Sequence, residues 1–455
     1  MEHVPTTLVG ATAKQISRAV RRGDTTATRV VADHLEQIAI SDPELRAFRV
    51  IRGGEAMTEA EQVDDQEDLS NLPLAGVPVA VKENTAVAGL PTWNGSATAR
   101  TAVAEHDHEV VRRLRGAGAV VVGVTRMPEL GLWAVTDDPD EATRNPWSLD
   151  RTPGGSTGGG AAAVAAGLVP IAQGTDGLGS VRIPAACCGL VGLKPGKDVV
   201  PADLGADGWF GLTENGVLTT TVGDAALGFS VLAGRRPPRL VEPSRLRVGV
   251  SLRSPIAGVG ADGPNRGAVA TAAKLLVNAG HSTVTAEPRY TPTLGLAGMA
   301  TWLAAAYRKV REDGLDSARL QPRTRRHAQL GKWFDGRGLA GQAHRDAWRE
   351  SSIEFFTDRG VDVLLTPALA RTPPPAAGHA AAGWWHSMTV NVRYAPFAAP
   401  WNFAGLPAIV VPVGVRPDGL PVAVQLVGPP DSELLLLSIA GQFEMQNPWQ
   451  RLAIV

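Results

Sequence analysis

The sequence predicts an α/β fold, and three observations support this class. Short apolar runs typical of buried strands alternate with amphipathic segments typical of helices. Glycine and proline mark the boundaries between these segments. The 455 residues are 44% apolar, which is enough for one large α/β domain or for two to three average ones.

The first half of the chain is expected to alternate helices and strands. Residues 11–41 carry apolar side chains at helical spacing, with a second run that starts at Thr26. Residues 52–71 are acidic and polar, which favours a helix leading into a loop. Further helices are predicted at 109–116, 158–168 and 224–233, and strands at 77–82, 119–124 and 169–172.

The second half continues this alternation after a segment rich in proline and arginine at 235–243, the best candidate for a linker. Residues 371–383 are rich in proline and alanine, which indicates a loop. A hairpin turned by Pro417-Asp-Gly419 is expected to join strands at 408–415 and 421–427. Other strands are predicted at 246–250 and 361–365, and helices at 268–279, 345–359 and 432–443.

Charge and composition argue against several functions. A net charge of −1 gives no reason to expect nucleic acid or an acidic membrane surface as a partner. The arginine-rich run at 323–326 is interpreted as a solvated face. No window of 18 residues is uninterruptedly apolar, and the first residues lack the features of a signal peptide. We therefore expect no membrane span and a cytoplasmic protein.

Metal and disulfide chemistry are not expected. The two cysteines, Cys187 and Cys188, are adjacent, so they cannot build a disulfide framework or a zinc site. His106 and His108 flank Asp107 in what we interpret as an exposed loop. The sequence therefore predicts no metal and no cofactor.

Three short motifs carry the chemistry. Ser156 and Ser180 each lie in a glycine-rich segment, which lets the backbone bend through positive φ and leaves N–H groups free for a ligand. Ser156 precedes a predicted helix, so it lies in the positive potential of a helix N-terminus. Lys82 ends an apolar strand, in a chain with only 7 lysines. A serine hydroxyl needs a base, and a buried lysine whose pKa falls toward 7 or 8 is one.

These motifs resemble the amidase signature family of serine hydrolases, at 76–84, 154–160 and 174–184. The resemblance extends from about residue 10 to 450 and includes 362–367, 400–407 and 425–428. It implies one amidase domain over 1–455, built on a large central mixed β-sheet covered by helices on both faces. Within this domain, the resemblance implies a helical segment at about 10–70, a catalytic core at about 72–235 and a C-terminal half at about 245–450 that carries the substrate-pocket loops.

The resemblance also implies a role for each matching residue. Ser180 corresponds to the nucleophile, Ser156 to a bridging serine on a cis peptide bond, and Lys82 to the base. The enzyme would cleave amide C–N bonds through an acyl-enzyme without a cofactor. Matching oxyanion-hole positions are the N–H groups of Gly177, Leu178, Gly179 and Ser180, and supporting positions are Thr157, Asp176 and Arg182.

Three positions depart from the family pattern. Thr157 replaces a usual serine and keeps its hydroxyl, while Cys187 replaces an often aromatic residue, which we interpret as a packing change. Leu178 stands where relatives usually carry glycine, and an L-residue restricts φ there.

Tryptophans indicate the substrate class. By analogy with the family, five of them approach the acyl pocket: Trp133, Trp209, Trp384, Trp385 and Trp401. They predict a roomy aromatic pocket for a small-molecule aryl or hydrophobic amide, with carbamates or urethanes as further substrates. A monomer or a homodimer is expected.

Three alternatives stay open at this point. Ser156 also fits a G-x-S-x-G motif, which would use a histidine such as His281 or His386, although no apolar strand precedes it. The chain could instead be the amidase subunit of a tRNA-dependent amidotransferase, active only in a complex. A silent binding protein on this fold is the third alternative, and the intact Lys82, Ser156 and Ser180 argue against it.

Overall fold

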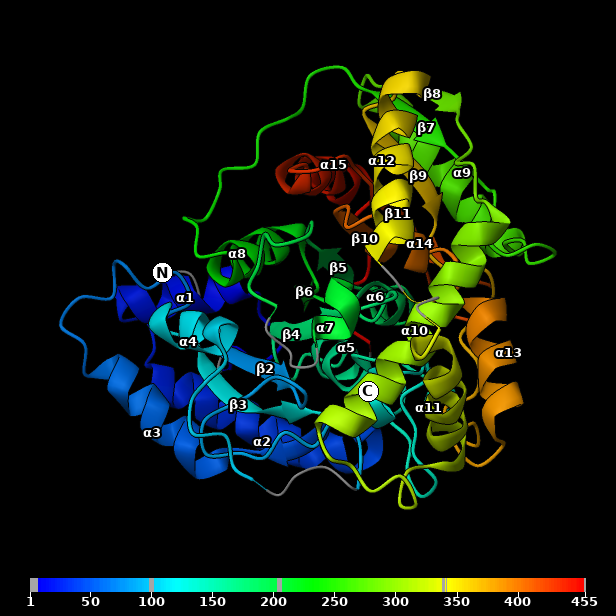
Figure 1. Cartoon of the computed structure of the whole chain (residues 1–455). Helices are drawn as coiled ribbons and strands as arrows, with labels where there is room; N and C mark the ends of the chain where they lie inside the picture. Colours follow the sequence, from blue (N-terminus) through cyan, green and yellow to red (C-terminus); the bar gives the residue numbers. More distant parts are fainter. Residues whose placement is uncertain (1–6, 98–101, 203–206, 338–339, 341, 454–455) are drawn as a thin grey trace.

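A mixed β-sheet forms the centre of the protein in a computed structural model that describes residues 7–97, 102–202, 207–337, 340 and 342–453 (Figure 1). Within these residues the sheet has 11 strands, in the order β1-β3-β2-β4-β6-β5-β10-β11-β9-β7-β8. Parallel pairs such as β2 with β3 and β4 lie beside antiparallel pairs such as β10 with β11. The sheet is therefore mixed, as predicted. The strands are β1 (Phe48–Ile51), β2 (Pro78–Lys82), β3 (Val120–Thr125), β4 (Ile171–Asp176), β5 (Val191–Lys194), β6 (Glu214–Thr219), β7 (Arg247–Val250), β8 (Ser282–Thr285), β9 (Val363–Pro367), β10 (Ala408–Val415) and β11 (Pro421–Val427).

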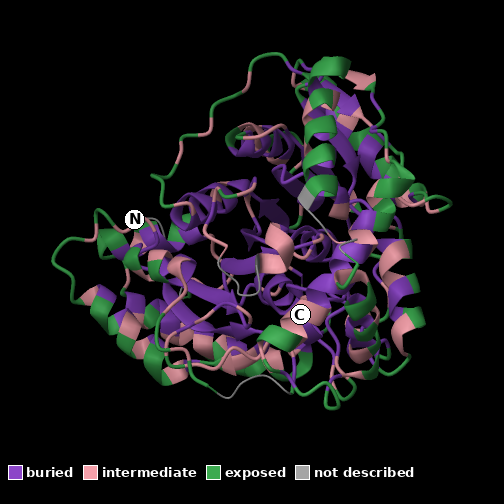
Figure 2. Cartoon of the chain, in the orientation of Figure 1, coloured by how far each residue is buried: buried purple, intermediate pink, exposed green. Residues whose placement is uncertain are grey.

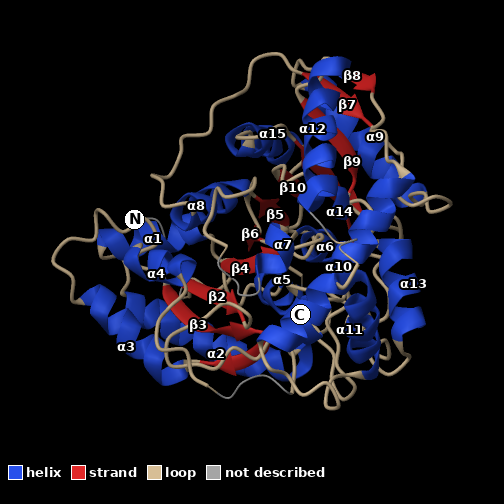
Figure 3. Cartoon of the chain, viewed as in Figure 1, coloured by secondary structure: helices blue, strands red, loops and turns tan. Residues whose placement is uncertain are grey.

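Helices cover both faces of this sheet (Figure 3). On one face α15 packs against both α8 and α9, and on the other α5 packs against α6. Strand β10 contacts α15 on the first face and α6 on the second. The helices of the described chain are α1 (Ala13–Arg22), α2 (Ala27–Leu45), α3 (Gly53–Asp64), α4 (Glu109–Gly116), α5 (Gly158–Ala165), α6 (Arg182–Cys188), α7 (Asp207–Gly211), α8 (Val222–Leu232), α9 (Gly263–Asn278), α10 (Pro292–Glu312), α11 (Pro322–Asp335), α12 (Gln342–Arg359), α13 (Trp384–Tyr394), α14 (Ala399–Phe403) and α15 (Glu433–Gln446).

Local signals explain where several helices begin. Thr12 caps α1 in a reciprocal capping box with Gln15, and Asp262 caps α9 ahead of Pro264. None of the described helices is long and apolar enough to cross a membrane. The buried centre of the molecule, purple in Figure 2, contains β2, β4 and α5, at whose ends the three motifs lie.

Helix α5 is buried along its whole length, because glycine and alanine let it approach the strands closely. A Cβ at Gly159 would lie 2.3 Å from the carbonyl oxygen of Ala47, and one at Gly158 would meet Thr136 at 2.2 Å. Glycine at these two positions therefore allows the start of α5, and the segment before it, to lie in close contact with Ala47 and Thr136.

The segment predicted as a linker, 235–243, contains no helix or strand and is largely exposed. Figure 1 shows it as a long green loop from α8 to β7. The sheet nevertheless continues from one half of the chain to the other, since β5 pairs with β10. The two halves therefore share one sheet.

The arginine-rich run at 323–326 is not the solvated face that its composition predicts. Arg323 is fully buried in α11 and forms an ion pair with buried Asp137, at 2.8 Å. Its neighbour Thr324 is also buried, while Arg326 is exposed. The interpretation failed because the partner lies 186 positions away in the chain.

Candidate active site

The three predicted residues come from the edges of neighbouring elements. Lys82 is the last residue of β2, Ser156 lies two residues before α5, and Ser180 lies between β4 and α6. Lys82 Nζ and Ser156 Oγ share a hydrogen bond of 2.7 Å, and both side chains are buried. Lys82 Nζ also donates to Thr175 Oγ1 at 2.9 Å and to the Thr175 carbonyl oxygen at 3.3 Å.

Burial changes the protonation of Lys82. Removal from water disfavours the ammonium and lowers the pKa of Lys82 to about 7, while the charges of Asp176 and Glu83 oppose this shift. A large fraction of the side chain is therefore neutral near pH 7, which is the state that can accept a proton.

The backbone around Ser156 has the predicted geometry. The Gly155–Ser156 peptide bond is cis, as the resemblance implied. A Cβ at Gly155 would lie 2.4 Å from the carbonyl oxygen of Trp133, so this position has no room for a side chain. Thr157 donates its backbone N–H to the Ser180 carbonyl at 3.1 Å, which ties the two serine segments together.

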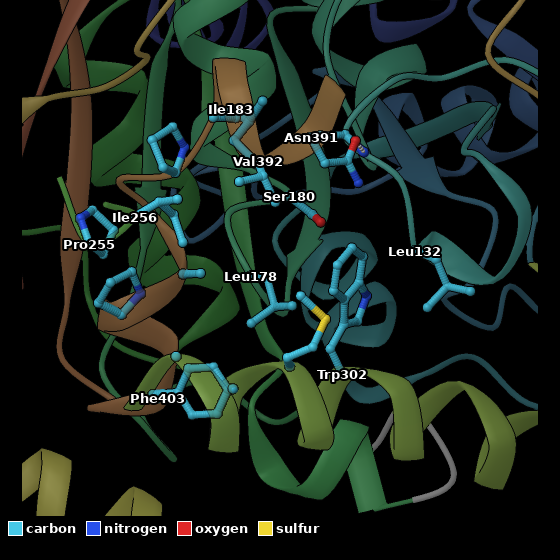
Figure 4. A pocket seen from close by; sticks show the side chains of 18 of the residues that line it. Leu132, Leu178, Ser180, Ile183, Pro255, Ile256, Trp302, Asn391, Val392 and Phe403 are labelled. Carbon is cyan, nitrogen blue, oxygen red and sulfur yellow. Dashed lines mark hydrogen bonds between the residues drawn. The ribbon is translucent and has the colours of Figure 1, made fainter. Parts of the chain in front are cut away.

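Ser180 faces open space. Its side chain makes no hydrogen bond to any described residue, and Figure 4 shows its oxygen directed into a cavity. Ser156 and Ser180 also line one small cavity together, although their hydroxyls are not hydrogen-bonded to each other. The structure thus joins Lys82 to Ser156 directly and places Ser180 beside them.

The predicted oxyanion donors are not equivalent. The N–H of Gly179 is already donated to Asp176 Oδ1, at 2.7 Å, so it is removed from the predicted set. Within the described chain, the N–H groups of Gly177, Leu178 and Ser180 have no acceptor. Positive φ occurs at Gly179, at 118°, and not at Leu178, so leucine is accommodated without strain.

A buried ion pair holds this loop. Arg182 binds both oxygens of Asp176 at 3.0 Å, and it also donates to Asn402 Oδ1 and Gln425 Oε1. Burial alone would raise the pKa of Asp176, but the Arg182 charge and hydrogen bonds hold it below its usual range. Asn402 and Gln425 lie in two C-terminal segments that carry the resemblance, 400–407 and 425–428. Through Arg182, these segments help to hold the loop that contains Ser180.

Ser180 opens on a largely apolar cavity of about 1000 Å³, open mouth included (Figure 4). Trp133 and Trp209, two of the tryptophans expected near the acyl pocket, line this cavity, and no described lining residue is charged. Met299 and Trp302 from α10, Asn391 from α13 and Phe403 from α14 complete much of the wall. None of these four was predicted as a pocket residue, because the 3.6-residue pattern of α10 and α13 was not recognised and Phe403 entered only as part of the 400–407 segment.

Three predicted pocket residues lie outside the lining of this cavity. Trp401 is buried in a separate core cluster with Trp348. Trp384 donates its Nε1–H to His327 Nδ1 at 3.0 Å, and Trp385 is 77% exposed on α13. The segments approach the site as expected, but their indole rings point elsewhere.

The histidine alternatives for Ser156 lack the required contacts. His281 bonds Gln442 and the Leu246 N–H, and His386 pairs with His379, while Ser156 bonds Lys82. His106 is exposed, and His108 caps α4. No group of three or more His, Cys, Asp or Glu side chains in the described chain is arranged to hold a metal ion.

Comparisons with known proteins show the family to which this chain belongs. The family model Amidase matches residues 29–437. The protein named "Putative amidase AmiB2" in Mycobacterium tuberculosis (strain ATCC 25618 / H37Rv) is 40% identical, over 98% of both chains. The 6-aminohexanoate-cyclic-dimer hydrolase of Paenarthrobacter ureafaciens is 32% identical, over 94% of this chain and 93% of the relative.

Solved structures give the same result. A substrate complex of 6-aminohexanoate cyclic dimer hydrolase matches with a TM-score of 0.86 and 28% identity, over 97% of this chain and 98% of that one. A bacterial aryl acylamidase matches with a TM-score of 0.83 and 25% identity, over 97% of both chains. These findings define the class as enzymes that hydrolyse amide C–N bonds. Within that class, the chain belongs to the amidase signature family.

Proposed function

We propose that this protein is a serine amidase that acts through Lys82, Ser156 and Ser180. The observation that carries the proposal is the 2.7 Å bond between buried Lys82 and Ser156, beside a serine that faces a substrate-sized cavity. A neutral lysine can take a proton from Ser156, and Ser156 can take one from Ser180. A rotation of the Ser180 side chain in the substrate complex would close this relay.

The reaction then follows in two steps. Ser180 Oγ attacks the carbonyl carbon, and its proton passes through Ser156 to Lys82. The N–H groups of Gly177, Leu178 and Ser180 are the donors for the resulting oxyanion. The C–N bond breaks, its electron pair stays on nitrogen, and Ser156 returns the proton to the amine. Water then hydrolyses the acyl-enzyme by the same relay and releases the acid.

The preferred substrates are hydrophobic or aryl amides. The cavity lining described above is uncharged and rich in tryptophan, leucine and proline, which favours apolar groups. The neighbouring fold of an aryl acylamidase supports the same class. Carbamates are secondary substrates, because their carbonyl presents the same target to Ser180 and to the oxyanion donors.

Two measurements test this proposal. A fluorophosphonate probe should label the purified chain, and Ser180→Ala should abolish the label. The isolated chain should also hydrolyse amides in a panel that contains phenylacetamide, acetanilide, acetamide and an aryl carbamate. Labelling that persists in Ser180→Ala, or a complete lack of amide hydrolysis, would contradict the proposal.

A further inference from the structure

Two cavities that differ in polarity meet at Ser180, and the smaller one has the larger polar share of its lining. The apolar cavity described above lies on one side, and a polar cavity of about 410 Å³, open space included, lies on the other. Ser180, Gly131 and Trp209 line both. Ser156 lines the polar cavity and does not line the apolar one. A carbonyl group beside Ser180 would lie where the two cavities meet, and each cavity could then receive one part of the substrate.

The position of Ser156 assigns the two parts, if the proposed function holds. Ser156 is the group that hands the proton to the departing nitrogen, so the nitrogen must lie on the Ser156 side. The amine part of the substrate consequently enters the polar cavity. The acyl part extends into the larger apolar cavity, where Trp302 and Phe403 form the wall.

The lining of the polar cavity includes one positively charged side chain among the described residues, that of Lys309. The cavity is also lined by Asn84, Asn94, Thr175 and Thr213. The side chain of Lys309 is 12% exposed and pairs with Asp313 at 2.9 Å. An ammonium has three donor hydrogens, and Asp313 needs one of them, so Lys309 can bind a further anion.

Helix α10 runs along both cavities and sets their spacing. Gly298, Met299 and Trp302 line the apolar cavity, and Lys309 lies two turns further on. Seven residues of helix span about 10 Å. Lys309 is thus outside the apolar cavity and lines the same small cavity as Ser180, which suits an amine part that is short and ends in a negative group.

We propose that the enzyme prefers N-acyl amino acids, in which an apolar acyl group is joined to a short amino carboxylic acid whose carboxylate binds Lys309. The acyl group enters the apolar cavity, and the amino acid leaves through the polar one. The products are the free amino acid and, after water attacks the Ser180 ester, the apolar carboxylic acid. Lys309 thus determines specificity and takes no part in the proton relay.

The test compares two matched substrates, N-phenylacetylglycine and N-phenylacetylglycinamide, by the release of phenylacetate. They differ in the charge of one terminal group. Wild-type enzyme should favour the carboxylate by about tenfold in kcat/KM, since a hydrogen bond to a charged group has about this effect. In Lys309→Met this preference should fall about tenfold, and in Asp313→Asn it should rise.

The preference is a ratio within one protein sample, so a partly unfolded variant does not distort it. Lys332→Met on α11 is the matched control, because Lys332 is exposed and outside both cavities, and the ratio should stay unchanged. A ratio of one, or a ratio that Lys309→Met does not lower, would overturn the inference. If both glycine conjugates resist cleavage while phenylacetamide is hydrolysed, the inference fails and the amidase function stands. If phenylacetamide also resists, the proposed function itself fails.

Discussion

Lys82 Nζ and Ser156 Oγ lie 2.7 Å apart although 74 positions separate them in the chain. The contact depends on β2, which ends at Lys82, and on α5, which approaches that strand through glycine and alanine. Larger residues in the first turn of α5 would displace Ser156, since Gly158 and Gly159 have no space for a Cβ. The Lys82–Ser156 contact on which the proposed proton relay depends is therefore set by backbone packing as much as by the two side chains.

The first prediction concerns the nucleophile. Ser180→Ala should lower kcat/KM for phenylacetamide by more than about a hundredfold, because the acyl-enzyme can no longer form. Ser70→Ala, an exposed serine outside the site, should leave the rate unchanged. A Ser180→Ala enzyme that keeps more than about a hundredth of the wild-type kcat would disprove the assignment.

The second prediction concerns pH. Because the pKa of Lys82 is lowered to about 7, kcat/KM should rise as pH increases through 7 and then level off, as the ammonium loses its proton. Lys82→Ala should remove this rising limb of the pH profile of kcat/KM, and most of the activity with it.

Glu83 provides the control for that pH profile, since burial raises its pKa to about 7 as well. The negative charge of Glu83 raises the pKa of Lys82, so Glu83→Gln should move the limb to lower pH without abolishing it. A limb that disappears in Glu83→Gln and persists in Lys82→Ala would assign the titration to the carboxyl group.

The third prediction concerns the Asp176–Arg182 pair. Asp176→Asn leaves the fully buried guanidinium without its counter-charge, which should lower the free energy of unfolding by about 3–5 kcal/mol. Urea denaturation measures this change. Asp198→Asn in the exposed pair with Lys197 is the matched control and should change it by less than about 1 kcal/mol. Equal effects of the two substitutions would show that the buried pair is not a stabilising centre.

The fourth prediction concerns the apolar cavity. Trp302→Ala should lower the preference for phenylacetamide over acetamide by about tenfold or more, since burial of a large apolar group contributes about 1.5–3 kcal/mol. Trp385→Ala should not change this preference, because the indole of Trp385 is exposed. A change of similar size in both variants would show that the cavity does not hold the phenyl ring.

Much of the fold could be predicted from short-range signals. The strand that ends at Lys82, the all-small helix after Ser156 and the hairpin of β10 and β11 were all recognised, because period and turn residues mark them. Strand β4 was predicted too short, since Gln173, Gly174 and Thr175 do not look like a buried strand. Gln173 is nevertheless satisfied by hydrogen bonds to Thr85 and Asn215 from elsewhere in the chain.

The site was predictable where its chemistry is local, and less so where distant segments meet. Motifs identify Lys82, Ser156 and Ser180, but nothing near Trp302 in the sequence indicates a cavity wall. Arg323 shows the same limit, because a buried cation can be recognised only with its partner Asp137. Likewise, the direction of an indole ring decides whether Trp384 or Trp209 meets a substrate, and helix α13 turns Trp384 toward His327.

The exposed segment at 235–243 is a position at which the chain of this enzyme could be divided into two polypeptides. Lys82, Ser156 and Ser180 all precede it, whereas Lys309, Asn402 and Gln425 all follow it. Since β5 and β10 join the two halves edge to edge, fragments separated within this segment retain a complete pairing surface for each other. Neither fragment alone contains both the relay and the residues that hold the Ser180 loop. Amide hydrolysis from a split gene would therefore report directly on the meeting of its two products.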